Sequence, residues 1–357
     1  MEYTHADYTG QDLFVGIDAS KRNWHIAIRV GHLAHKRFAQ RPQAEVLLAY
    51  LRRHFPGARY HCVYEAGYEG FWMHDQLRTL GAECIVVHPA DVPTSDKERQ
   101  FKNDPVDADK LARDLSTGAL RAIYVPARGL VEDRSLIRMR SCFVRKQTRC
   151  KNQIKALLEF YGHRVPEEHM ERYWSRAYIR WIESLTMERP SGSQALHALV
   201  QELLFLRQTI AQINRQIRSL AHEEPYASVV PWISSISGVS LLAAMIFVAE
   251  VVDINRFANL DELASYVGLV PGERSSGDSK TFTGITRRRN ATLRHMIIEC
   301  AWVAQREDPA LLEAFRQLSG RMPKNKAIVR IARKLLNRMR FAWKNKQAYV
   351  VGVASTC

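Results

Sequence analysis

The chain has 357 residues, 46% of them hydrophobic, and carries 52 Lys and Arg against 37 Asp and Glu, a formal net charge of +15. This length allows two or three packed cores, and the excess of positive charge favours a polyanionic partner, because basic surface releases counterions condensed on phosphate backbones. No run reaches the ~20 apolar residues of a membrane-spanning helix, and the six cysteines form no C-x-x-C pair. Membrane proteins, zinc sites and disulfide frameworks are therefore disfavoured, and we expect a soluble, intracellular protein that binds nucleic acid.

The first third of the chain predicts strands followed by alternating helices and strands. Three closely spaced strand-like runs, which favour an antiparallel meander, are LFVGID (13–18), WHIAIRV (24–30) and AHKRFAQ (34–40). Helices are predicted at 43–55, 69–81 and 104–118, with strands at 59–66 and 83–89. This order predicts a mixed α/β sheet rather than a doubly wound parallel one.

Carboxylates fall at the ends of these elements. Asp18 ends the first predicted strand, Glu65 ends the fourth, and Asp104 and Asp107 stand three residues apart at a helix start. If these ends converge, the four acids make an all-oxygen site that suits Mg²⁺ or Mn²⁺. Each acid alone has a structural alternative: Asp104 as an N-cap, Asp107 as a first-turn charge, and Asp18 as the start of an Asx turn.

Taken jointly, four such acids in a strongly basic chain favour a metal site. Two divalent ions held a few ångströms apart can activate a nucleophile and stabilise the leaving oxygen in phosphodiester cleavage. Asp109 and Asp114 occupy other positions on the same predicted helix, and we expect both to be solvated.

The middle of the chain predicts a basic helical arm. A helix is expected from about 131 to 161, and its Arg145, Lys146 and Arg149 are candidate nucleic-acid contacts, with a solvated helix face as the alternative. A second helix, about 194 to 222, repeats Leu or Ile every three or four residues, which predicts a coiled coil or a long helical hairpin. The seam could close within the chain or between subunits, so the arm also favours oligomerisation.

The last third predicts a helical domain. WISSISGVSLLAAMIFVAEV (232–251) indicates two helices joined by a glycine turn and resembles a helix-hairpin-helix unit, with Ser240 where a second glycine is usual. A helix capped by Asn259 and ended by Gly268 follows, then a polar, glycine-bearing loop and an amphipathic helix over 291–305. The serines of that loop are, by themselves, very weak indications of catalysis.

Three segments, GIDASK, YEAG and KNDPVDADKLA, resemble the RuvC-like, RNase H-fold domain of the IS110 family of bacterial insertion-sequence DEDD transposases, which includes the IS1111 subgroup. GLVP, SSG and GITRRRNATLR resemble the C-terminal transposase domain of the same family, although Arg289 stands where a glycine is common, and 324–346 resembles its closing basic helix. The insert at 162–193 is the least recognisable part. We accordingly expect a RuvC-like domain at 1–128, a basic coiled-coil arm at 129–225 and a C-terminal transposase domain at 226–357.

The resemblance implies a composite active site on DNA. The implied catalytic residues, of which the four acids hold Mg²⁺ or Mn²⁺, are Asp18, Glu65, Asp104, Asp107 and Ser276. Ser276 is the expected nucleophile and Ser275 the alternative, while Arg287, Arg288 and Arg294 are expected to hold the nucleic-acid backbone.

The resemblance further implies a transposase that cuts and rejoins strands of donor and target DNA. The same resemblance implies a structured guide (bridge) RNA as a partner and assembly into a dimer or tetramer. It also implies a cytoplasmic, nucleoid-associated location in a bacterium. Two alternatives remain open from the residues: a hydrolytic RuvC-type nuclease such as a junction resolvase, with water as nucleophile, and a non-enzymatic nucleic-acid-binding protein whose acids are structural caps.

Overall fold

The chain forms two compact units in a computed structural model. They are Met1–Val125 and Pro126–Cys357. The structure describes residues 7–93, 104–171, 173–276 and 279–351, with the backbone alone described at 104–105, 273–276 and 279–283.

The first unit is built on a five-stranded sheet with the order β3-β2-β1-β4-β5. The strands are β1 (Asp12–Ala19), β2 (Trp24–Val30), β3 (Leu33–Gln40), β4 (Arg59–Glu65) and β5 (Glu83–Val87). Short turns join the first three strands, which therefore pair antiparallel, whereas helical connections make β4 parallel to β1 and β5 parallel to β4. The predicted mixed sheet is confirmed.

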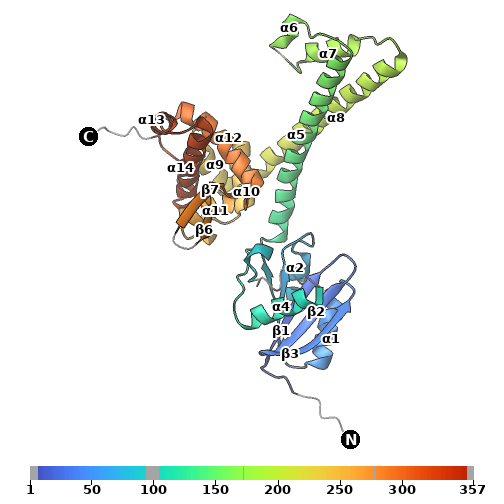
Figure 1. The fold of residues 1–357 in the computed structure, drawn as a ribbon, viewed down its shortest axis with the longest axis vertical. Helices are drawn as coiled ribbons and strands as arrows, with labels where there is room; N and C mark the ends of the chain where they lie inside the picture. The colour runs from blue at the N-terminus through green and yellow to red at the C-terminus, as the bar shows by residue number, and fades with distance from the viewer. Residues whose placement is uncertain (1–6, 94–103, 172, 277–278, 352–357) are drawn as a thin grey trace, which may run out of the picture. The chain divides into compact units, whose positions relative to one another are not determined.

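Helices cover both faces of this sheet (Figure 1). Helices α1 (Ala44–His54) and α2 (Trp72–Thr79) bury Leu47, Leu51 and Leu77 against one face. Helix α4 (Asp104–Ser116) lies on the other face, where Ala108 and Ala112 cluster with Ala27 of β2. A single turn of 3-10 helix, η1 (Pro89–Asp91), follows β5.

The second unit begins with two long helices that pack along one another, α5 (Arg128–Phe160) and α8 (Pro190–Leu220) (Figure 1). Two short helices, α6 (Glu167–Met170) and α7 (Arg176–Ser184), lie between them in sequence. The buried stripe of α8 is Leu196, Val200, Leu203, Leu206, Ile210, Ile213 and Ile217. Much of the predicted apolar seam thus closes against α5 of the same chain.

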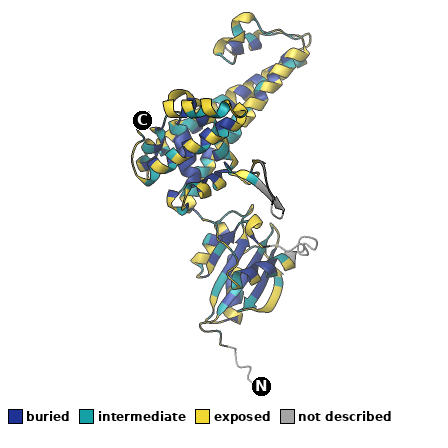
Figure 2. Cartoon of the chain, turned by 60° about the vertical axis from the view of Figure 1, so that its left-hand side comes forward, coloured by how far each residue is buried: buried dark blue, intermediate teal, exposed yellow. Residues whose placement is uncertain are grey.

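The rest of the second unit is a helical bundle around α10 (Leu241–Val251), which is buried nearly all round (Figure 2). The surrounding helices are α9 (Tyr226–Ser234), α11 (Leu260–Val267), α12 (Ala291–Glu307), α13 (Pro309–Ser319) and α14 (Lys324–Lys344), with a 3-10 turn η2 (Ile254–Arg256). The predicted cap of α11 is confirmed, because the Asn259 side chain accepts a hydrogen bond from the Glu262 amide at 3.0 Å. Its predicted end is also confirmed, since Gly268 is left-handed with a φ of 86°.

One element differs from the sequence-based expectation. The segment expected to be a polar loop contains two antiparallel strands, β6 (Pro271–Ser276) and β7 (Ser279–Ile285). Within the described part of the chain they form a two-stranded ribbon, separate from the five-stranded sheet. Backbone pairing can hold such a ribbon without the alternating apolar residues by which strands are recognised.

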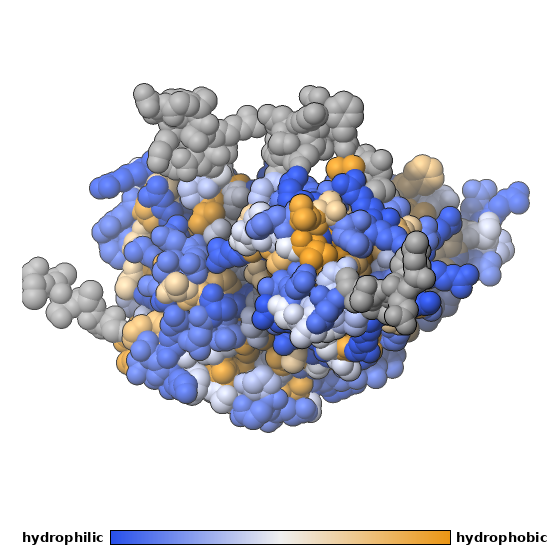
Figure 3. All heavy atoms as spheres, turned by 90° about the horizontal axis from the view of Figure 1, so that it is seen from below, coloured by the Kyte–Doolittle hydropathy of each residue, from blue (hydrophilic) through white to orange (hydrophobic). Residues whose placement is uncertain are grey.

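In the part of the chain that the structure describes, no helix is both long and apolar enough to cross a membrane. Hydrophilic residues cover most of the face shown in Figure 3, and hydrophobic residues form small groups among them.

Candidate functional site

The register of the sheet brings Asp18 and Glu65 side by side. Ile17 pairs with Tyr64 in the parallel β1–β4 ladder. Asp18 follows Ile17 and Glu65 follows Tyr64, so the two acids are neighbours near the carboxyl ends of their strands. Side chains alternate along a strand. Because Ile17 and Tyr64 are buried under α1 and α2, the two acids project from the opposite face, on which α4 lies.

Gly16 allows α4 to approach this face closely. A Cβ at residue 16 would lie 2.6 Å from the Ala112 nitrogen and closer still to the Ala108 carbonyl oxygen. Asp107 directly precedes Ala108, and Asp104 lies about one helical turn earlier. The close contact at Gly16 therefore places α4, which carries Asp104 and Asp107, on the face of the sheet that carries Asp18 and Glu65.

The complete set of four ligands stays a prediction. The side chains of Asp18 and Asp107 are partly buried and that of Glu65 is exposed, while the side chain of Asp104 lies outside the described residues. Among the described side chains, no three from His, Cys, Asp and Glu gather closely enough to hold a metal ion. The structure does bring Asp18 and Glu65 together: both stand near the carboxyl ends of neighbouring strands and on the same face of the sheet.

Two other acids of α4 are not solvated, so that expectation is wrong. Asp109 accepts hydrogen bonds from Arg29 of β2 at 2.9 Å and from Arg37 of β3 at 2.7 Å. Asp114 is only 6% exposed and accepts one from Arg113 at 2.9 Å. Because α4 lies flat on the sheet, its flanks as well as its central stripe meet other residues.

Sequence reasoning missed His25 and Tyr68, which lie near Asp18, and Lys21, which lies over the ring of Tyr68. His25 is directly opposite Asp18 in the β1–β2 ladder. Tyr68 is 58% exposed, and the Lys21 ammonium lies 5.7 Å from the centre of its ring. Partial burial, the neighbouring Glu69 and the charge of Asp18 raise the pKa of Tyr68 to about 12, so its phenol remains a hydrogen-bond donor at neutral pH. The signal in the sequence that could have indicated Tyr68 is its position three residues after Glu65.

The predicted nucleophile lies on the ribbon of the second unit. Ser276 ends β6 and pairs with Ser279, and Ser275 pairs with Lys280. The side chains of both candidate serines lie outside the described residues, so the choice between them stays a prediction.

A buried polar network stands next to the arginine-rich segment that follows this ribbon. Asn290 caps α12 by accepting a hydrogen bond from the Leu293 amide at 3.1 Å, and its amide group donates to Glu250 at 2.8 Å. Glu250 of α10 is fully buried and also accepts from Arg138 of α5 at 2.7 and 2.8 Å. Burial alone raises the pKa of Glu250, but the hydrogen bonds and charges of Arg138, Asn290 and Arg134 outweigh it and lower the pKa. This network fixes Asn290, the residue that ends the RRRN sequence.

The three arginines predicted to hold nucleic acid here have different surroundings. Arg287 and Arg288 are exposed. Arg294 is partly buried and donates a hydrogen bond to the Thr286 carbonyl, and a Cβ at Gly268 would lie 2.7 Å from its guanidinium. Arg294 therefore braces the loop before α12, and nucleic-acid contact by any of the three stays a prediction.

The arm residues predicted to hold nucleic acid are accessible. Arg145, Lys146 and Arg149 of α5 are exposed, and the Lys146 ammonium lies 5.0 Å from the centre of the Phe143 ring. Their contact with phosphate stays a prediction.

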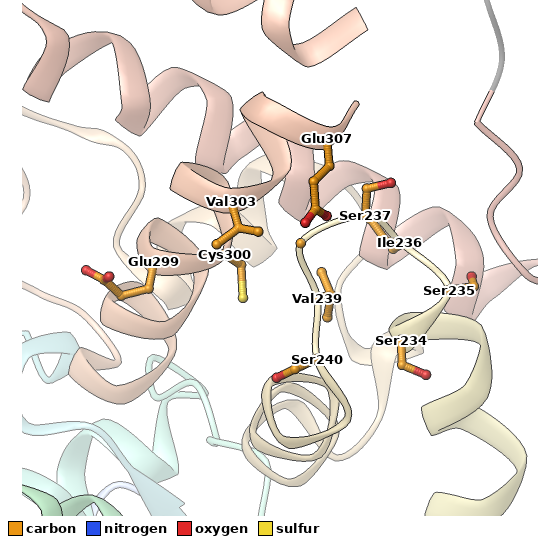
Figure 4. Close-up of a pocket in the computed structure, with 11 residues that line it drawn as sticks. Ser234, Ser235, Ile236, Ser237, Val239, Ser240, Glu299, Cys300, Val303 and Glu307 are labelled. Carbon is orange, nitrogen blue, oxygen red and sulfur yellow. The ribbon is translucent and has the colours of Figure 1, made fainter. Parts of the chain in front are cut away.

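The turn between α9 and α10 lines a pocket of about 610 Å³ together with α12 (Figure 4). Ser240 caps α10 by accepting a hydrogen bond from the Ala243 amide at 3.2 Å. Glu299 and Glu307 of α12 also line this pocket, and carboxylates repel a phosphate. Two helices joined by a glycine turn are present as expected, whereas the helix-hairpin-helix resemblance and phosphate binding by the turn stay predictions.

Comparison with known proteins covers both units. Residues 15–163 match the family model of the IS110-type DEDD transposase, and residues 231–317 match the family described as Transposase IS116/IS110/IS902. A Sinorhizobium fredii protein named as transposase y4qE is 32% identical over 301 residues, which cover 83% of this chain and 72% of that protein. The chain belongs to the IS110 family of transposases. It is thus an enzyme that acts on DNA.

Other relatives align over shorter or more divergent stretches. The transposase for insertion sequence element IS1328 of Yersinia enterocolitica is 24% identical over 298 residues, covering 81% of this chain and 83% of that protein. The transposase for IS1111A of Coxiella burnetii is 28% identical over 200 residues, covering 56% of this chain and 54% of that protein. The match over residues 15–163 begins within β1, at Val15, and covers the rest of the five-stranded sheet. This sheet is consistent with an RNase H-like DEDD domain.

Proposed function

We propose that this IS110-family transposase cuts and rejoins the DNA strands of an insertion sequence and its target at a site that combines carboxylates with a serine. The observation that carries the proposal is the placement of Asp18 and Glu65 side by side on the sheet face where α4 lies. In the proposal, Asp104 and Asp107 of α4 complete the carboxylate set.

The proposed carboxylates fit a divalent cation. Hard oxygen ligands suit Mg²⁺ or Mn²⁺, and a carboxylate at the end of a strand is held by the ladder on either side. A bound ion would supply Lewis-acid activation of the nucleophile and neutralise charge on the phosphate. The chain's own contribution is to fix the acids on rigid elements, with Tyr68 near Asp18 as a donor and Lys21 over the Tyr68 ring as a cation for the DNA backbone.

The Ser276 hydroxyl is the proposed nucleophile. Its oxygen forms a bond to phosphorus as the bond from phosphorus to a deoxyribose oxygen breaks, and its proton passes to that leaving oxygen. The phosphoserine ester retains the energy of the broken bond, so a hydroxyl from another strand can attack it and rejoin DNA without a further energy source. Family membership and the Ser-Gly sequence support this assignment.

A structured guide RNA and an oligomer complete the proposal. The guide rests on the family resemblance alone: base pairing would select donor and target sequences, while exposed cations such as Arg145, Arg149 and Arg287 hold phosphates. Two-ended strand exchange needs several active sites, and this favours a dimer or tetramer.

Denaturing electrophoresis for a covalent DNA–protein adduct tests the serine. Nucleic acid that copurifies with the protein is sequenced first and then supplied with DNA and Mg²⁺. Wild type should form the adduct, Ser276→Ala should not, and Ser275→Ala is the matched control that should. Cleavage by Ser276→Ala without an adduct would instead establish the hydrolytic alternative, and loss confined to Ser275→Ala would move the nucleophile by one residue.

Metal binding is tested apart from activity. Isothermal titration with Mn²⁺ should show weaker binding for Asp18→Asn and for Asp104→Asn than for wild type. Glu45→Gln is the control, because Glu45 is an exposed acid of α1, which covers the opposite face of the sheet. Unchanged Mn²⁺ binding and unchanged cleavage in both variants would favour structural caps and a non-enzymatic binding protein.

Mixing two inactive variants tests how the site is assembled. Asp18→Asn and Ser276→Ala subunits regain adduct formation together only if the acids of one subunit serve the serine of another. A mixture that stays inactive assigns both groups to the same subunit.

A further inference from the structure

The last helix of the chain is strongly basic. Helix α14 (Lys324–Lys344) contains eight Lys and Arg residues and no Asp or Glu. Its apolar face is already buried in the core through residues such as Ile331, Leu335 and Met339. An apolar face that is occupied leaves only the polar side of this helix for a partner.

Seven of the eight basic residues of α14, all except Lys324 at its first position, fall into two groups. Members of the first group are held by the rest of the domain: Arg333 by Asp261, Arg338 by Asp308, Arg340 by the Ala258 carbonyl and Lys344 by the Phe257 carbonyl. These cations are used within the fold, so an external anion is not needed to account for them.

The second group forms an exposed stripe, the α14 stripe, made of Lys326, Arg330, Lys334, Asn337 and Phe341. At about 100° per residue these five positions fall within an arc of about 80°. Lys326, Arg330 and Lys334 form no ion pair with any acid in the described part of the chain. Phe341 is 52% exposed although it is a large apolar side chain. Positive charge, a neutral amide and an apolar ring thus share one accessible face.

We infer that the α14 stripe enters the major groove of a DNA duplex. The inference rests on the proposed function, in which the protein acts on DNA. The stripe extends over 15 helical steps, about 22 Å, and the major groove, about 12 Å wide, admits an α-helix. Three cations spaced along the helix match phosphates along the groove, an asparagine can pair with adenine, and an apolar ring can contact a thymine methyl group.

The same geometry disfavours an RNA duplex. The major groove of A-form RNA is deep and narrow, so a helix cannot place its side chains there. The inference therefore separates α14 from any surface that holds a structured RNA, and it assigns to α14 a duplex whose strands are both DNA.

Equilibrium binding of the full chain to a 30-base-pair DNA duplex, followed by fluorescence anisotropy over a range of salt concentrations, tests the inference. The slope of log K against log salt is negative, and each lost phosphate contact reduces its magnitude by about 0.9. The double variant Arg330→Ala with Lys334→Ala should therefore reduce the magnitude of the slope by about 2. Phe341→Ala should weaken binding at every salt concentration with the slope unchanged, because it carries no charge.

The matched control removes two exposed arginines from other helices of the same bundle, Arg306→Ala with Arg316→Ala. It changes the net charge equally and should leave the slope close to that of wild type. The charge-preserving pair Arg330→Lys with Lys334→Arg should restore the slope, and the thermal midpoint of each variant shows that the domain is folded.

Three outcomes would overturn the inference, and they are distinguishable. If wild type binds no DNA, the proposed function fails with it. If wild type binds DNA and the Arg330/Lys334 double variant keeps the wild-type slope, or loses no more than the control, the inference alone fails. If an RNA duplex of the same sequence binds as well as DNA and loses the same slope, the surface is a general polyanion site and the groove assignment is wrong.

Discussion

The buried Glu250 carboxylate accepts both hydrogen bonds of a two-pronged contact from Arg138, at 2.7 and 2.8 Å. The pair joins α10, the centre of the bundle, to α5 of the arm. Since the same carboxylate holds Asn290, the pair also fixes the start of α12, next to the arginine-rich segment.

Arg138→Ala should lower the free energy of unfolding by about 2 kcal/mol. Removing one partner of a buried pair costs about 3–5 kcal/mol, and the cost is smaller here because Arg138 is half exposed while Arg134 and Asn290 remain near Glu250. Urea unfolding measures the change. The control is Arg128→Ala, which breaks an exposed pair with Glu132 and should cost less than about 0.5 kcal/mol. Equal effects of the two variants would contradict the role given to Glu250.

Acid should destabilise wild type more steeply than Glu250→Gln. Contacts with Arg138, Asn290 and Arg134 lower the pKa of Glu250 below its ordinary value of 4.5 despite its burial. The stability that this carboxylate contributes is therefore complete above about pH 4.5 and is lost as the pH falls through the folded-state pKa. Unfolding midpoints of both proteins from about pH 6 to 3 give the comparison. Parallel curves would show that Glu250 is not the titrating group.

Gly16→Ala should damage both the fold and the enzyme. Its Cβ would lie 2.6 Å from the Ala112 nitrogen, so α4 must move away from the sheet, at a cost of about 1–3 kcal/mol. Because α4 carries Asp104 and Asp107, Mn²⁺ binding should also weaken. Gly129→Ala is the control, since a Cβ there meets open space. A folded Gly16→Ala protein with wild-type Mn²⁺ affinity would separate α4 from the proposed metal site.

Asp109→Ala should lower stability by about 1–2 kcal/mol, because hydrogen bonds to charged groups contribute about 1.5–3 kcal/mol and one partner is half exposed. Arg29→Ala should cost more than Arg37→Ala, since the Arg29 side chain is 14% exposed and that of Arg37 is 49% exposed. Thermal unfolding of the three variants tests the order. A larger effect of Arg37→Ala would contradict the account of how α4 is fixed.

The sequence predicted the sheet well because each of its strands carries a local signal. Apolar runs such as 13–18 and 59–66 are bounded by turn residues, and the structure has strands at Asp12–Ala19 and Arg59–Glu65. The candidate acids were located for the same reason, since Asp18 and Glu65 stand where those runs stop. Their adjacency, in contrast, depends on the β1–β4 register, which pairs residues more than 45 positions apart.

Other features could not be read from local pattern. The β6–β7 ribbon is polar and rich in Ser, Thr and Gly, so its strands lack the alternation by which strands are recognised. Glu250 stands as a single acid in an apolar run of the sequence, and its partners come from distant segments, α5 and the start of α12. Helix α13, in contrast, carries a local signal that was overlooked, since Asp308 caps it and Pro309 opens it.

The absence of acids from α14 has a thermodynamic consequence for the whole C-terminal bundle. Neighbouring cations on one helix repel one another when no anion stands between them. A polyanion that binds only the folded helix relieves this repulsion and raises the free energy of unfolding by RT ln(1 + [L]/Kd). DNA would thus be a folding ligand as well as a substrate, and purification that strips nucleic acid from this protein would also remove part of what keeps it folded.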